Sequence, residues 1–111
     1  RILYTGDVGA SLGQDYRIVP DFDAHIPLME GFHTRYMASN ASLRAWVRMV
    51  KQLDIETIAP QHGAAFQGKE MSTKFLDWLE QLDVGVDAFP DMYALPAEGT
   101  TAFEAPAMAS K

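Results

Sequence analysis

The stretch IAPQHGAAF, which runs from Ile58 to Phe66, places a histidine two residues after a proline that ends a run of strand-forming residues. A β-branched run that stops at a proline is typical of a short β-strand. Glycine and two alanines follow His62, and such small residues let the backbone and neighbouring side chains approach the imidazole ring. The pattern fits a metal-ligating histidine at a strand end, and it fits an ordinary tight turn equally well.

A second strand end carries an aspartate in the same setting. The segment 2–5 reads as a short strand that stops at Gly6, and Asp7 follows directly. In α/β sheets, sites form at the carboxyl ends of strands, so Asp7 and His62 would meet if these strands lie side by side. Taken singly, Asp7 fits a turn aspartate and His62 a loop histidine, but their shared position beside a glycine favours metal ligands. Two ligands are too few for a protein metal site, so the others would have to come from elsewhere.

The composition argues against several classes of function. The 111 residues fit one small domain, and the net charge of −6 disfavours non-specific nucleic-acid binding and docking on an anionic membrane. The chain has no cysteine, which rules out disulfides, thiolate metal sites and a cysteine nucleophile within it. This fits a reducing compartment, and we expect the cytoplasm. No apolar run approaches the roughly 20 residues of a membrane span, and no signal peptide is recognised.

Three helices are predicted around the two strands from the spacing of apolar residues. Their expected ranges are 21–38, 41–53 and 69–82. The regular part of the first should begin near Pro27, because proline fits the first turn of a helix. Ser39 is a cap signal for the second helix, and Gly85 is a plausible terminator of the third.

This order of strands and helices is α/β in character. Two short strands cannot make a sheet that covers three helices, which suggests a missing partner segment. The chain goes from Arg1 at once into a strand, which looks like the middle of a domain. Residues 1–89 therefore read as the folded portion, and the proline- and alanine-rich residues 90–111 as a linker or draped tail.

Other residues that could carry chemistry are less persuasive. Glu30 and His33 stand in the Glu-x-x-His arrangement of helix-bundle di-iron proteins, but no second copy is present. We therefore expect a solvated pair on a helix surface, and we expect His25 at the surface or at a helix end. The glycines of GDVGASLG lack the lysine of a phosphate loop, and Ser11 has no evident histidine partner.

Four stretches, LYTGDVGAS, GFHTRYMASN, IAPQHGAAFQGKE and FLDWLEQL, resemble the C-terminal half of metallo-β-lactamase-fold di-iron proteins. The most similar branch is that of the oxygen-binding di-iron proteins, which is related to the flavodiiron oxygen and nitric oxide reductases. The resemblance covers about residues 1–88, and its more specific part is IAPQHG combined with the upstream RYMASN. It implies a four-layer αββα sandwich of which this chain supplies the second half.

The resemblance also implies roles for individual residues. Asp7 matches the carboxylate that bridges the two metals, His62 matches the last histidine ligand, and Tyr36 matches a tyrosine near the metal pocket. The family's remaining ligands, in a His-x-Glu-x-Asp motif and a further histidine, are not in this chain and would belong to the N-terminal half of the domain. Gly63 would leave room for the metal cluster. The flavodoxin domain of the flavodiiron relatives is not matched, so no flavin is expected in this chain.

The leading interpretation is a portion of a di-iron protein that binds O₂, or reduces O₂ or NO, packed against the N-terminal half of its own domain. A homo-oligomer is compatible with this interpretation. A zinc-dependent hydrolase of the same superfamily, in which the metals activate water, is the first alternative. The second is a non-catalytic helical interaction module in which Asp7 and His62 are structural. Metal content separates the iron interpretation from the zinc one.

Overall fold

The computed structural model describes residues 1–91 and Leu95. The elements follow the order β1 (Ile2–Gly6), α1 (Phe22–Tyr36), α2 (Asn40–Val50), β2 (Thr57–Pro60) and α3 (Lys69–Gln81). Both strands and all three helices agree with the sequence prediction apart from their ends. Most of the predicted tail, 90–111, lies outside the described residues. Within the described part of the chain, we find no helix that is both long and apolar enough to cross a bilayer.

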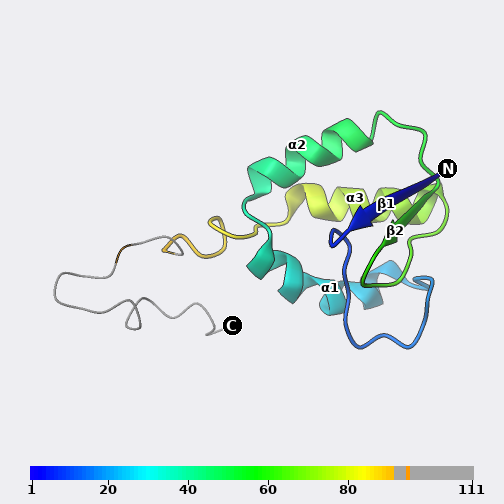
Figure 1. Ribbon diagram of the computed structural model, residues 1–111, viewed down its shortest axis with the longest axis horizontal. Helices are drawn as coiled ribbons and strands as arrows, with labels where there is room; N and C mark the ends of the chain where they lie inside the picture. The colour runs from blue at the N-terminus through cyan, green and yellow to red at the C-terminus, as the bar shows by residue number, and fades with distance from the viewer. Residues whose placement is uncertain (92–94, 96–111) are drawn as a thin grey trace.

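The two strands form a parallel sheet that α1 and α2 connect (Figure 1). Parallel neighbours require such a crossover, because a tight turn can join only antiparallel strands. Leu3 pairs with Ile58 and Gly6 pairs with Pro60, with an irregularity of register between Tyr4 and Gly6. The carboxyl ends of β1 and β2 therefore lie next to each other.

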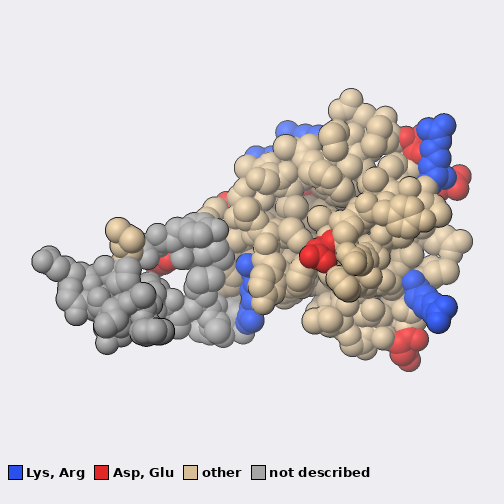
Figure 2. Space-filling view, in the orientation of Figure 1, with Lys and Arg blue, Asp and Glu red and all other residues tan. Residues whose placement is uncertain are grey.

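The two faces of this sheet differ in burial. Ile58 and Pro60 on β2 are buried, and α3 packs against that strand. On β1, Ile2 and Tyr4 are 56% and 76% exposed. On the side of the molecule that shows β1 in Figure 1, most side chains are uncharged, and the charged ones lie mainly towards the rim, apart from an acidic group near the middle (Figure 2). Among the described residues, nothing buries this apolar outer face of β1.

The core lies between the inner face of the sheet and the helices. Phe66 and Phe75 stack there, with ring centroids 4.2 Å apart and an angle of 17° between the rings. All three helices contribute buried apolar side chains to this core, namely Phe22, Met29, Leu43, Val47, Val50, Leu76 and Leu79. The loops that follow β1 and β2 begin at the edge of this core.

Helix α1 begins five residues earlier than predicted, at Phe22, and Pro27 lies inside it. The Asp21 side chain caps the helix by accepting from the Asp23 N–H at 3.1 Å, and the His25 N–H donates to the Asp21 carbonyl oxygen, also at 3.1 Å. These bonds stabilise the first turn of the helix, which precedes Pro27. Because proline lacks only its own N–H, Pro27 removes one intrahelical hydrogen bond. The cap predicted at Ser39 is confirmed, since its side chain accepts from the Ser42 N–H at 3.3 Å.

Gly85 has a different role from the one predicted. Helix α3 already ends at Gln81, and the chain continues beyond Leu82 before it reaches Gly85. Gly85 is buried with a φ of +53°, and its N–H donates to the Thr34 carbonyl oxygen at 2.8 Å. A Cβ at this position would lie 2.1 Å from the Ala38 carbonyl oxygen. Gly85 therefore docks the segment after α3 onto the end of α1 instead of ending α3.

Candidate metal centre

The paired strand ends bring the two predicted ligands to one edge of the sheet. Beyond the Gly6–Pro60 pair, the Gln61 N–H donates to the Gly6 carbonyl oxygen at 2.8 Å. Asp7 directly follows Gly6, His62 directly follows Gln61, and both are exposed. The structure confirms that the two strand ends adjoin, while the role of these side chains as ligands stays a prediction.

The loops that carry Asp7 and His62 also interlock through their backbones. The Ser11 N–H donates to the His62 carbonyl oxygen at 2.9 Å. A Cβ on Gly63 would stand 2.9 Å from both the Gly9 carbonyl oxygen and the Ser11 nitrogen. The sequence suggested that Gly63 leaves room for a metal cluster, but the space is taken by the Asp7 loop itself. The missing side chain thus lets the loops that carry Asp7 and His62 touch.

The Asp7 carboxylate and the His62 imidazole are free to bind a metal. Among the described residues, neither side chain makes a hydrogen bond or an ion pair. A carboxylate can bridge two metal ions and an imidazole nitrogen can bind one, so the donor set suits iron or zinc. The part of the chain that the structure describes contains no cluster of three or more metal-binding side chains. These two residues therefore fit a portion of a metal site and not a whole one.

His33 on α1 was wrongly expected on the helix surface. It is fully buried, and Glu30 is exposed, so the two residues lie on different faces of α1. The Gly9 N–H donates to Nε2 of His33 at 2.8 Å, and Nδ1 of His33 lies 2.8 Å from the Met29 carbonyl oxygen. Burial lowers the pKa of His33 below its usual value. This histidine therefore joins α1 to the loop that carries Asp7.

His25 was likewise wrongly expected at the surface or a helix end. It is fully buried, and Nδ1 lies 2.7 Å from the Tyr16 hydroxyl. Its ring packs edge-on against Phe66 at 5.7 Å between centroids, and burial lowers its pKa. Nε2 of His25 has no hydrogen-bond partner among the described residues. His25 ties the segment before α1 to the core.

A signal for both histidines exists in the sequence. The buried positions of α1 are Phe22, His25, Met29 and His33, which recur at intervals of three and four residues. That spacing marks the inner face of a helix. The expectation that both histidines are exposed was wrong because it rested on the polarity of histidine and ignored their positions in this series.

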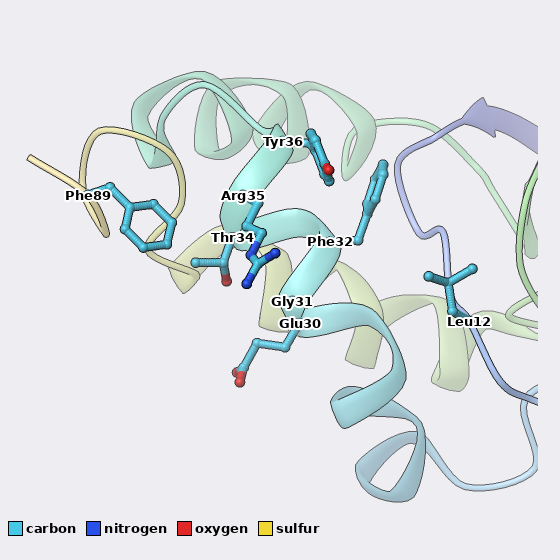
Figure 3. A pocket seen from close by; sticks show the side chains of 8 residues that line it. All are labelled: Leu12, Glu30, Gly31, Phe32, Thr34, Arg35, Tyr36 and Phe89. Atoms are coloured by element: carbon cyan, nitrogen blue, oxygen red, sulfur yellow. The ribbon is translucent and has the colours of Figure 1, made fainter. Parts of the chain in front are cut away.

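Tyr36, the last residue of α1, is 71% exposed. Its ring lies 5.1 Å from that of Phe32, between centroids, and both line an open hollow of about 450 Å³ whose other lining residues include Leu12 and Phe89 (Figure 3). Neither Asp7 nor His62 lines this hollow. Tyr36 follows His33 by one helical turn, and its predicted place near the metals stays a prediction.

Comparisons with known proteins match the chain to one family and to solved structures. The family model described as "ODP family beta lactamase" matches residues 1–63. A solved structure described as "Peroxy diiron species of chemotaxis sensor ODP" is 45% identical, with a TM-score of 0.78 over 83% of this chain and 40% of that one. The apo state of the chemotaxis sensor ODP from T. denticola is 44% identical, with a TM-score of 0.76 over 83% of this chain and 39% of that one. No curated protein matches the chain.

The chain thus spans about 40% of the length of these solved relatives. The resemblance expected from the sequence is confirmed at the level of the family. Because the family model covers more than half of the sequence, the chain belongs to the ODP family of beta-lactamase-like proteins.

Proposed function

We propose that this chain contributes Asp7 and His62 to a di-iron centre that binds O₂. Asp7 would bridge the two irons and balance part of their charge, and His62 would bind one of them. The observation that carries the proposal is the adjacency of the two strand ends, which presents a free carboxylate and a free imidazole on interlocked loops. When bound, the two irons would supply the electrons with which a diatomic ligand is held.

The solved relatives support iron and O₂ over the alternatives. A relative that is 45% identical is described as a chemotaxis sensor with a peroxy diiron species. This description favours iron over zinc, O₂ over NO, and sensing over turnover. A flavin is not part of the proposal. We also propose that the protein lies in the cytoplasm, since the chain lacks cysteine. A homo-oligomer is compatible with the proposal.

The remaining ligands would come from the other half of the domain. Asp7 and His62 cannot complete the coordination of two metals, and the described residues hold no third ligand beside them. The exposed, apolar outer face of β1, with Ile2 and Tyr4, is where a covering layer would pack in a four-layer αββα sandwich. We therefore propose that this face meets the segment that carries the other ligands.

The proposal is tested by counting irons in the complete protein that contains this chain. Asp7→Ala should abolish loading of the pair, because a bridging carboxylate touches both irons. His62→Ala should weaken mainly one iron, because an imidazole nitrogen binds one metal. The matched control is Asp15→Ala, which removes an exposed aspartate from the same loop. Elemental analysis gives the iron count, and circular dichroism checks folding.

Several outcomes would contradict the assignment. Two irons retained in folded Asp7→Ala would end the bridging role of Asp7. Zinc in place of iron in the parent would favour the hydrolase alternative. No metal of either kind would favour the interaction module, in which Asp7 and His62 only shape their turns.

The packing of the two halves has its own test. If the outer face of β1 needs a covering layer, the isolated 111-residue chain should not form a stable monomer. Thermal unfolding followed by circular dichroism measures this. A cooperative transition from the isolated monomeric chain would contradict the packing proposal and leave the metal assignment untouched.

A further inference from the structure

Four consecutive N–H groups of the loop after Asp7 are all hydrogen-bonded. The N–H of Val8 donates to the Thr5 carbonyl oxygen at 3.2 Å, and that of Ala10 donates to the Asp7 carbonyl oxygen at 3.0 Å. These two bonds form the local turn. The N–H groups of Gly9 and Ser11 instead leave the loop, to His33 on α1 and to the His62 carbonyl oxygen respectively. The loop is therefore hydrogen-bonded to two other segments of the chain, and one of these two bonds is to the side chain of His33.

The tie at His33 uses the whole imidazole ring. Because the Gly9 N–H donates to Nε2, that nitrogen must be unprotonated, and Nδ1 must carry the hydrogen that Met29 accepts. The ring packs edge-on against Trp78 and Phe32, with centroids 5.6 Å and 5.4 Å away. A fully buried ring with both nitrogens bonded and aromatic neighbours cannot turn without losing these contacts.

Gly9 meets His33 in a conformation that only glycine adopts easily. Its φ is +97°, and a Cβ there would stand 3.3 Å from atoms of Phe66 and Pro60. This backbone conformation directs the Gly9 N–H towards α1, and the surrounding core leaves little room for a side chain at this position. Gly9 lies two residues from Asp7, so the position of this N–H helps to set where the carboxylate points.

We propose that His33 is a positioning residue for the metal centre, which holds the Asp7 loop at a fixed distance from α1 through the Gly9 N–H. This inference rests on the proposed role of Asp7 as an iron ligand. It predicts that His33 controls how tightly iron is held even though it never touches the metal. The loss of a residue that orients a metal ligand without touching the metal typically changes the metal affinity by about 10- to 100-fold.

The experiment uses the complete protein with two variants of His33 and one control. His33→Phe keeps a ring in the core and loses both hydrogen bonds. His33→Gln keeps a side-chain oxygen that can accept from Gly9. His25→Phe is the control, since His25 is equally buried on α1 but bonds Tyr16, further along the chain, and makes no hydrogen bond to residues 8–11.

Three measurements separate the loop from the metal. Amide hydrogen exchange of Gly9, followed by NMR in the iron-free protein, reports whether the loop is held. Release of iron to a chelator and the visible absorption band of the oxidised centre report whether the ligands are positioned. We expect His33→Phe to expose the Gly9 amide, release iron about tenfold faster and shift the band. His33→Gln should restore all three, and His25→Phe should change none.

Iron release and spectrum unchanged in His33→Phe would overturn the inference, as would equal effects in His25→Phe. If His33→Phe does not fold, His33→Asn takes its place, because it keeps a donor to Met29 and cannot reach Gly9. A parent protein without iron would overturn the proposed function instead, and Gly9 exchange would still show whether His33 holds the loop.

Discussion

Replacing Gly63 with alanine adds one methyl group between the two loops that carry the predicted ligands. Gly63 is outside the left-handed region of backbone space, so the backbone itself accepts alanine. The new Cβ would stand 2.9 Å from the Gly9 carbonyl oxygen, the Ser11 nitrogen and the Ser11 hydroxyl. Two of these three are backbone atoms, which cannot rotate away. The cost therefore comes from steric overlap alone.

The size of the effect follows from the distances. Ordinary contact begins near 3.4 Å, so the loops must separate by about 0.5 Å to accept the methyl group. Overpacking of this kind costs about 1–3 kcal/mol. The same movement weakens the bond from the Ser11 N–H to the His62 carbonyl oxygen, which contributes about 1 kcal/mol. We expect Gly63→Ala to lower the free energy of unfolding by about 2–4 kcal/mol, which most domains survive.

Urea unfolding of the complete protein and iron release to a chelator measure the two consequences. Iron should be released faster, because Asp7 and His62 are pushed apart. Gly31→Ala is the matched control: Gly31 lies inside α1 with nothing within 4 Å of its Cβ position, and alanine there should add about 1 kcal/mol of stability. A Gly63→Ala protein with the stability and iron release of the parent would refute the claim that these loops touch through Gly63.

Three further predictions concern Tyr36, the two buried histidines and Gly85. Tyr36→Phe should alter O₂ affinity or the lifetime of the oxidised state at normal iron content, and unchanged oxygen binding would assign Tyr36 to packing alone. Stability should fall on acidification, since burial lowers the pKa values of His25 and His33 from the ordinary 6.5. Below about pH 6.5 the unfolded chain binds protons at these two histidines more readily than the folded chain does. The free energy of unfolding therefore falls by up to about 1.4 kcal/mol per pH unit for each histidine. Urea unfolding between about pH 7.5 and 5 measures this, and a flat profile would contradict it. Gly85→Ala places a Cβ 2.1 Å from the Ala38 carbonyl oxygen at a φ of +53°, so it should cost about 3 kcal/mol or more in a thermal melt, and parent-like melting would contradict it.

Much of the architecture could be predicted from the sequence because its signals are local. The apolar run that stops at Gly6-Asp7 and the run that stops at Pro60 define the two strands. Ser39 caps α2 as predicted, since a cap is made with the N–H of a residue three positions on. The family resemblance rests on the same short stretches.

The roles of His25, His33, Gly63 and Gly85 were decided only by tertiary structure. Each depends on an atom distant along the chain: the Nε2 of His33 meets an N–H 24 residues away, and Gly63 faces the loop that contains Gly9. The spacing along α1 indicates that His25 and His33 face the core, but it does not show which donor will be folded against each ring. A buried polar group is stable only when such a partner is present, and the packing of α1 on the Asp7 loop supplies the partner of His33. Other tertiary contacts make points of backbone contact of Gly63, expected to leave room for a metal cluster, and of Gly85, expected to end a helix.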